Sequence, residues 1–549
     1  MTETRFFSDG TQQWFVRCCH VLVALVLAGL FVENFIFSEG FGLLGFREVD
    51  DVAFQTSLRA VHEALRAGHF DKIFALNDYA YGWVFWAPMA VLSFPFYVLQ
   101  QATGIEWPLI VLPRMVSLAF TGLSLVVMRR LLRQLAVPEW ACALALLIFL
   151  LTPAMGYFSL RFGTVSPVAF FSLAAVYLAL RDDVDCETSV RQSLLCLAVG
   201  GGIKLSGLLV LPLVGVLLLI RLRRAGLPWV STLFKPGLKF LVLLALLTNP
   251  QFIAAPFKPQ IWPKYWGTLS QIIEGTRVPS GPADPVQRLY LGALGTPCNA
   301  LAMAILAAGW LFVVLRDRAR RWDFVAIVAV VGLVALYLAV SVKNHLSVGS
   351  YFTSVAFLAI LGVAGHVGHR AGAWVLLSVL ALLVADGWLR LDANRSSRVD
   401  LWSHFSYVTK RAHVAQDVDA AEHVGECMER AMAGHRIDHV FMDYTAPTNV
   451  NALSLPGACV SVAWDNLDPA LRYCPRAVDL LVLDARDAVG ALDQGSFDAR
   501  VKATNERVAQ GYLTDRATRR QLSETGQFGD QRFELSCDLG RVKVYRAVP

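Results

Sequence analysis

Long apolar runs alternate with short polar segments over residues 1–390. A membrane-spanning helix needs about 20 mostly apolar residues, and fewer when protein surrounds it. This pattern predicts about 11 spans, near residues 15–37, 108–128, 140–158, 162–180, 192–203, 205–220, 237–253, 297–315, 324–342, 349–367 and 373–390. Residues 192–220 could form one tilted helix, but Gly200-Gly201-Gly202 followed by Lys204 favours a break between two short spans.

The composition supports a membrane location. Hydrophobic residues make up 56% of the 549 positions and charged residues 17%, and the mean hydropathy is +0.50. A soluble chain this apolar could not cover its surface with polar groups, so lipid must be part of its solvent. The net charge of +6 does not by itself indicate a class of partner. We expect no nucleic-acid partner.

The positions of the arginines predict the orientation. If the apolar segment 82–101 does not span, all the arginine clusters between spans fall on one side, as the positive-inside rule requires of the cytoplasmic side. The clusters are Arg129, Arg130 and Arg133; Arg221, Arg223 and Arg224; Arg316, Arg318, Arg320 and Arg321; and Arg370. We therefore predict that residues 82–101, rich in aromatic residues and broken by two prolines, form an interfacial helix. The loops 38–107 and 254–296 and the chain after residue 391 then lie outside.

Residues 391–549 differ in composition from the rest. Apolar runs shorten to strand length at 438–443, 458–463 and 479–484, and helix-like stretches separate them. This alternation predicts a small α/β domain on the extracytoplasmic side, beyond a polytopic helical membrane domain of residues 1–390.

The cysteines fall into two groups. Six lie in or near apolar segments, where we expect small core residues. The absence of CxxC pairs argues against a zinc or iron–sulfur site. If the C-terminal region is extracytoplasmic, one or two disulfides can form there, and spacing does not reveal the pairing. The cysteines of that region are Cys427, Cys459, Cys474 and Cys537.

The first predicted outer loop carries the candidate chemistry. Asp50 and Asp51 precede an amphipathic stretch that ends at Gly68, and the sequence Asn77-Asp78-Tyr79-Ala80-Tyr81-Gly82-Trp83 follows. One role for the acidic pair is helix capping, because a carboxylate satisfies free backbone N–H groups at a helix start. Capping by one aspartate leaves the other available for chemistry.

The order of motifs resembles the C-type glycosyltransferase superfamily, especially the bacterial branch related to protein O-mannosyltransferases and the lipid A aminoarabinose transferase. The resemblance covers residues 15–370 and depends on order, since no single motif is specific. Its elements are the acidic pair, the Tyr81-Gly82-aromatic turn, Pro113-Arg114-Met115-Val116-Ser117 and Arg129-Arg130 at the two ends of a span, the Gly/Lys turn of residues 201–212, and Thr248-Asn249-Pro250.

The resemblance implies an inverting glycosyltransferase that takes a sugar from a polyprenyl-phosphate carrier. A carboxylate accepts the proton of the acceptor hydroxyl as that oxygen attacks the sugar carbon, and the lipid phosphate leaves. By motif order Asp50 matches the base and Asp51 the following acid, and both stay candidates. The expected location is the bacterial inner membrane, with the active site on the extracytoplasmic side. The expected partners are the lipid-linked sugar donor, a lipid, glycan or protein acceptor, and membrane lipids.

Candidate contacts for the donor phosphate or sugar lie mostly at predicted outer helix ends. Lys204 is the strongest of these candidates, because a charge within apolar helices is costly unless it is paired or reaches the headgroups. Two positions depart from the family pattern: Val165 stands where relatives often carry a second acid, and Lys343-Asn344-His345 where many have Arg-Tyr. The full candidate set is Lys204, His345, Lys343, Arg161, Lys258, Lys264, Tyr81 and Asp78.

No cofactor is expected, and one acidic pair is thin support for a divalent cation. The alternative functions are a flippase or transporter of a lipid-linked glycan, a lipid-linked oligosaccharide ligase, and a membrane scaffold with a partner-binding tail. Transporters tend to place polar residues in mid-membrane and to show repeated halves. Here the acids gather early, in a predicted outer loop, which favours the enzyme.

Overall fold

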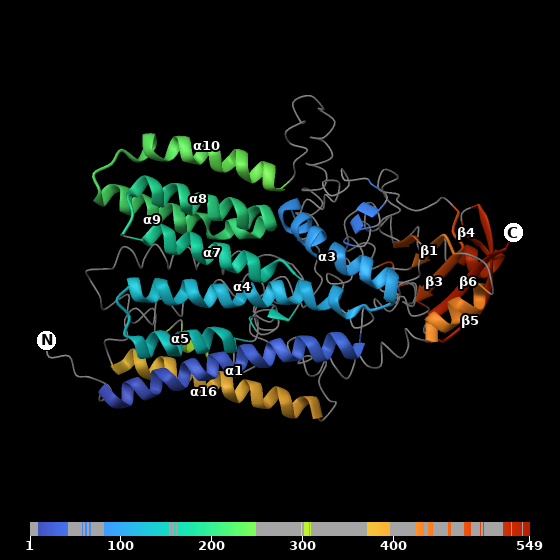
Figure 1. Cartoon of the computed structure of the whole chain (residues 1–549), viewed down its shortest axis with the longest axis horizontal. Coiled ribbons are helices and arrows are strands. Elements are labelled where there is room, and N and C mark those ends of the chain that lie inside the picture. The colour runs from blue at the N-terminus through green and yellow to red at the C-terminus, as the bar shows by residue number, and fades with distance from the viewer. Residues whose placement is uncertain are drawn as a thin grey trace. The chain divides into compact units, whose positions relative to one another are not determined.

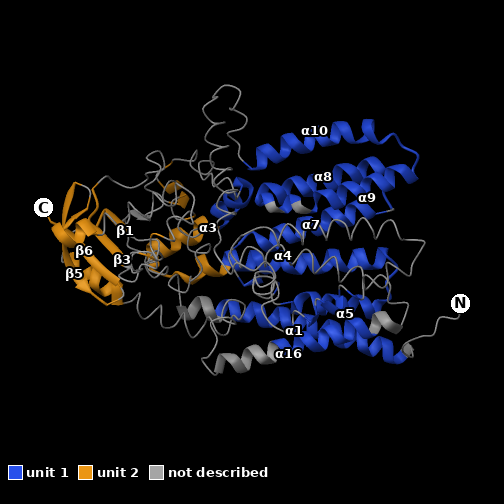
Figure 2. Ribbon diagram, turned by 180° about the vertical axis from the view of Figure 1, so that it is seen from behind, with its two compact units in different colours: residues 1–35, 70–92, 112–410 blue, residues 36–69, 93–111, 411–549 orange. Residues whose placement is uncertain are grey.

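The structure is a computed structural model of the whole chain (Figure 1). Figure 2 shows its two compact units, unit 1 (residues 1–35, 70–92 and 112–410) and unit 2 (residues 36–69, 93–111 and 411–549). The described residues are 9–41, 58, 61–62, 65–66, 68, 82–152, 155, 159–160, 163–181, 183–248, 298, 301–302, 304–306, 308, 370–395, 423–432, 437–442, 459–462, 477–484, 495, 498, 520–528, 530–540 and 542–548.

Helices make up the described part of the chain up to residue 395. Among them, the segments Gly10–Phe35, Trp83–Thr103, Trp107–Gln134 and Trp229–Thr248 are long and apolar enough to cross a membrane. The helices are α1 (Asp9–Phe41), α3 (Trp83–Thr103), α4 (Trp107–Gln134), α5 (Glu139–Leu151), α7 (Val165–Leu180), α8 (Cys186–Ile203), the 3-10 helix η3 (Leu205–Val210), α9 (Leu211–Arg224), α10 (Trp229–Thr248) and α16 (Arg370–Arg395).

The predicted break after Gly200-Gly201-Gly202 is confirmed. Helix α8 ends at Ile203, Lys204 has an extended backbone, and η3 then leads into α9. The segment predicted to be interfacial is α3, whose length and composition would also let it cross a membrane. Its interfacial position stays a prediction. The predicted spans at 324–342 and 349–367 lie outside the described residues, as does most of the span at 297–315.

Helix α5 is the most enclosed element of unit 1. Every residue from Trp140 to Leu150 is buried, and α5 packs in one core cluster with residues of α4, α7, α9 and α16. At 1.5 Å per residue its 13 residues span about 20 Å, less than the hydrocarbon thickness. Such a short apolar helix is tolerated because protein surrounds it.

One end of unit 1, here called the arginine end, gathers two of the predicted arginine clusters. Arg133 Nε lies 2.6 Å from Glu139 Oε1 at the start of α5. Arg221, near the end of α9, donates to Ser189 Oγ at 2.7 Å and to the Val184 carbonyl at 2.6 Å. Arg221 and Gln134 also donate to carbonyl oxygens of the last turn of α7. The ends of α4, α7 and α9 and the starts of α5 and α8 therefore meet here.

Unit 2 holds a six-stranded sheet in the order β2-β1-β3-β6-β5-β4. Strand β1 runs parallel to β2 and β3, whereas β6 is antiparallel to β3 and β5. The three strands predicted from the sequence are β1, β2 and β3. The strands are β1 (His439–Met442), β2 (Cys459–Val462), β3 (Leu480–Asp484), β4 (Gln527–Phe528), β5 (Gln531–Asp538) and β6 (Val542–Val548). The predicted domain boundary near residue 391 stays a prediction, since unit 2 also includes residues 36–69 and 93–111.

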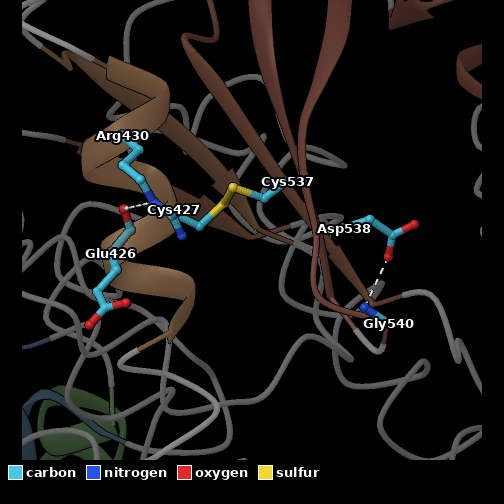
Figure 3. Close-up of a disulfide and its surroundings, with 6 residues drawn as sticks. All are labelled: Glu426, Cys427, Arg430, Cys537, Asp538 and Gly540. Carbon is cyan, nitrogen blue, oxygen red and sulfur yellow. Dashed lines mark hydrogen bonds between the residues drawn. A yellow bond between two sulfur atoms is a disulfide. The ribbon is translucent and has the colours of Figure 1, made fainter.

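A disulfide joins Cys427, in the helical residues 423–432, to Cys537 of β5 (Figure 3). The pair is separated by 110 positions, with Cα atoms 6.2 Å apart. Phe533 packs on one face of the sheet, but Cys537 packs on the other, against the cluster of Cys427. Residues an even number apart share a face, so the bulge between Leu535 and Cys537 is what turns Cys537 toward its partner. The expectation of a disulfide among the four cysteines is confirmed for this pair.

Candidate functional site

The C-terminal end of α8 packs backbone against backbone with its neighbours, at what is here called the glycine junction: Gly82, Gly200, Gly201, Gly202 and Gly207. A Cβ added at Gly82 would lie 1.8 Å from the Gly202 carbonyl oxygen and 2.6 Å from that of Leu247. A Cβ added at Gly207 would lie 2.7 Å from the Gly200 carbonyl oxygen. Only residues without a side chain permit this approach of the turn before α3, α8, η3 and α10.

Hydrogen bonds fix the same junction. The Gly82 N–H donates to the Ile203 carbonyl at 3.2 Å, and the Trp83 indole N–H donates to the Leu246 carbonyl at 2.5 Å. Gly82 and Trp83, which lie within the first predicted outer loop of residues 38–107, are therefore attached to the ends of α8 and α10.

Lys204 lies at the centre of this junction. Its φ and ψ of −153° and 127° take the chain out of the helix, while its N–H donates to the Gly200 carbonyl at 3.1 Å and its carbonyl accepts from Gly207 at 2.8 Å. The half-buried Lys204 thus has a backbone held on both sides, next in the chain to the residue that bonds Gly82.

The glycine junction and the arginine end lie at opposite ends of α8. Ser189, in the first turn, contacts Arg221, and Lys204 follows the last residue. Eighteen residues at 1.5 Å each separate the two ends by about 27 Å. Val165, which stands where the resemblance leads us to expect a second acid, begins α7, and α7 ends at the arginine end. Val165 therefore lies toward the same end as Lys204.

The sequence around the glycine junction carries positive but no negative side chains. No acidic residue occurs between Glu187 and Glu274, so the segment that holds Lys204 contributes only positive charge. Within the described residues, no group of three or more His, Cys, Asp or Glu side chains could hold a metal ion. Cationic groups in such a setting can hold a phosphate.

Lys204 is the predicted site residue that the structure describes. The other candidates lie outside the described residues, so the structure does not test whether they meet. These are Asp50, Asp51, Asp78, Tyr81, Arg161, Lys258, Lys264, Lys343 and His345.

A buried polar stripe on α4 was not predicted as part of the site. Arg114, only 3% exposed, is followed at helical spacing by the buried residues Ser117, Thr121 and Ser124. The hydroxyl of Thr121 lies 2.8 Å from Ser159 Oγ and donates to the Ser117 carbonyl at 3.1 Å. Spacings of three and four residues put these side chains on one face, a signal that the sequence contained. An ionisable residue buried in a membrane helix is a functional candidate, so Arg114 joins Lys204.

Solved structures share this fold, and they include the following two. One is ArnT from Cupriavidus metallidurans bound to undecaprenyl phosphate, which is 14% identical and superposes with a TM-score of 0.54 over 95% of this chain and 97% of that chain. The other is ArnT from the same organism in the apo state, also 14% identical, with a TM-score of 0.51 and the same coverage. No protein-family model matches the chain, and no curated protein matches its sequence.

The long apolar helices and these neighbours indicate a multi-pass membrane protein that shares its fold with ArnT. ArnT is the lipid A aminoarabinose transferase, a member of the C-type glycosyltransferase superfamily. The resemblance predicted from the order of motifs is confirmed for the fold.

Proposed function

We propose that the protein is an inverting glycosyltransferase of the bacterial inner membrane that moves a sugar from a polyprenyl-phosphate carrier to an acceptor hydroxyl. The observation that carries this proposal is a fold shared along nearly the whole of both chains with ArnT, which was crystallised with undecaprenyl phosphate. Sequence identity of 14% leaves the sugar and the acceptor open.

The proposed active site lies on the extracytoplasmic side. The positive-inside rule favours a cytoplasmic arginine end, and the glycine junction with Lys204 lies at the other end of α8. The disulfide Cys427–Cys537 supports an extracytoplasmic C-terminal region, because disulfides persist in oxidising compartments. The free cysteines among the described residues lie in the helices of unit 1, with Cys186 and Cys142 in first turns at the arginine end.

In the proposed reaction, Asp50 or Asp51 accepts the proton of the acceptor hydroxyl. The acceptor oxygen forms a bond to the anomeric carbon from the face opposite the phosphate, which inverts that centre. The bond between the anomeric carbon and the phosphate oxygen breaks, and the lipid phosphate leaves with the electron pair. Lys204 stabilises the negative charge that develops on that phosphate. The glycine junction holds the backbone of Lys204 in place.

The test compares envelope lipids and glycans, by mass spectrometry, in a strain lacking this protein and in the same strain expressing wild type or the double variant Asp50→Asn/Asp51→Asn. We expect one sugar to disappear from an envelope glycan or lipid, to return with wild type, and to stay absent with Asp50→Asn and Asp51→Asn combined. A different result would favour the flippase function over the transferase: the purified protein moves lipid-linked sugar across liposome membranes but does not transfer it to an acceptor.

A further inference from the structure

Helices α9 and α10 form a basic hairpin on the surface of unit 1. Helix α9 ends with Arg221, Arg223 and Arg224, and α10 carries Lys235 and Lys239. The turn between them closes through Gly226, whose φ of +67° suits glycine, and through the Leu227 N–H, which donates to the Leu222 carbonyl at 3.0 Å. The hairpin lies within the acid-free stretch of the sequence.

Arg221 and Arg223 have different surroundings. Arg221 points its guanidinium inward, where Ser189 and the Val184 carbonyl satisfy it, and so anchors the base of the hairpin. Arg223 is exposed one residue from the end of α9. The first arginine is structural, whereas the second adds positive charge to the surface.

Helix α10 has one face on the protein and one face away from it. Phe240, Leu244 and Leu247 pack into the core cluster of unit 1. The opposite face exposes Phe234 (72% exposed) and Leu238 (56% exposed), and α10 packs on α8 (Figure 1). Because α10 is apolar and long enough to cross a membrane, its outward face is expected to contact lipid.

Lys235 and Lys239 lie on that outward face. They are four residues apart and exposed, so they project from the same side, about 6 Å apart along the axis. Neither is in an ion pair with any residue that the structure describes. An ammonium group on a lipid-facing surface extends to the headgroup layer. Lys235 and Lys239 lie about 9 and 15 Å along α10 from Trp229. The span predicted at residues 237–253 puts the headgroup layer of the arginine end beside both lysines.

We propose that Lys235 and Lys239 bind the phosphate of an anionic phospholipid, as phosphatidylglycerol has, on the outward face of α10 at the arginine end. The exposed Leu238 and Leu241 contact its acyl chains, which extend away from the arginine end. Charge complementarity selects this ligand, because two exposed lysines that form no ion pair with a described residue attract an anionic headgroup and offer nothing to the cationic group of a zwitterionic one. This lipid site does not depend on sugar transfer.

The experiment measures phospholipid bound to the purified full-length protein by native mass spectrometry, after exchange into detergent with equal amounts of phosphatidylglycerol and phosphatidylcholine. The wild type is expected to retain phosphatidylglycerol in preference. The double variant Lys235→Gln/Lys239→Gln is expected to retain about tenfold less, and Lys235→Arg/Lys239→Arg to retain it as wild type does. Arg191→Gln, which removes an exposed cation from α8, is the matched control and is expected to change nothing.

Unchanged retention in the glutamine variant would overturn the site, as would equal retention of phosphatidylcholine by the wild type. Displacement of the lipid by millimolar inorganic phosphate would show a site for soluble anions and also overturn the proposal. If the double glutamine variant does not fold, the single variants Lys235→Gln and Lys239→Gln are each expected to lower retention, and wild-type retention in both would count against the site.

Discussion

The N–H of Gly82 donates to the carbonyl of Ile203, and this one bond attaches the segment before α3 to the last residue of α8. The two residues lie far apart in the sequence. Their contact puts the predicted outer-loop turn beside Lys204, and it is possible because Gly82 has no side chain. The backbone thus determines where Lys204 stands.

Gly82→Ala is expected to disrupt the glycine junction. The new Cβ would lie 1.8 Å from the Gly202 carbonyl oxygen, which is backbone and cannot turn away. Such overpacking costs about 1–3 kcal/mol or more. Thermal unfolding of the purified protein measures the loss. The control is Gly215→Ala in α9, which has no atom within 4 Å of its Cβ position and should unfold at the wild-type temperature or slightly above it. Equal unfolding temperatures for Gly82→Ala and wild type would refute the close approach.

Asp50→Asn is expected to lower sugar transfer by about 10²–10⁴-fold, the usual contribution of a general base. The amide has the shape of the carboxylate but cannot accept the proton. Turnover of lipid-linked sugar by purified variants tests this, with Asp51→Asn alongside. If Asp51→Asn loses activity and Asp50→Asn keeps it, the base is Asp51.

Lys204→Gln is expected to lower kcat/KM for the lipid-linked donor by about 10²–10³-fold, because a charge facing the leaving phosphate is lost. Lys204→Arg should recover part of the activity, since it keeps the charge but changes its position. Arg191→Gln is the control, because Arg191 is exposed and lies 2.8 Å from Glu187 in an i,i+4 ion pair. Wild-type kinetics for Lys204→Gln would mean that this lysine does not contact the donor.

Loss of the disulfide is expected to destabilise unit 2 by about 2–5 kcal/mol. Cys427→Ser, Cys537→Ser and the double variant should behave alike, because each removes the same cross-link. Unfolding temperature and maleimide labelling of thiols, with and without reductant, measure the effect. Cys186→Ser is the control, a free cysteine in unit 1. A thiol at Cys427 that reacts without reductant would contradict the pairing.

The turn between β5 and β6 is expected to loosen in acid. The Gly540 N–H donates to the Asp538 carboxylate at 2.9 Å, and this bond, with Lys543, holds the pKa of Asp538 below its usual value. A lowered pKa in the folded state gives stability above the unfolded-state pKa, and that stability is lost as the pH falls through the lowered value. Hydrogen-exchange protection of the Gly540 amide should fall over this range. In Asp538→Asn it should not depend on pH there.

Local rules predicted the helices of unit 1 well. Apolar length located α1, α4 and α7, and three glycines before Lys204 located the break after α8. The length of α5 was overestimated, since the predicted span 140–158 continues past Leu151. Thr152 and Pro153 follow Leu151, and the residue before a proline is disfavoured in a helix, so the end of α5 had a local signal that apolar length did not use.

The site depended on tertiary contacts that no local pattern contains. The sequence identified Lys204 as a charge in an apolar setting, but not that Gly82 would pack against Gly202. Arg114 was read only as part of a motif, although the polar residues that follow it recur at helical spacing. In unit 2, three strands were predicted from their apolar runs, whereas β5 and β6 mix polar and apolar residues and were not.

The position of β6 in the sheet affects the order in which this region can assemble during synthesis. Strand β6 lies between β3 and β5, so the parallel strands β1, β2 and β3 keep an unpaired edge until residues 542–548 have emerged. Cys427 likewise stays a free thiol until Cys537 has been synthesised. Nascent chains therefore pass through a stage with a bare strand edge and a reactive thiol, when mispairing with other chains competes with completion of the fold.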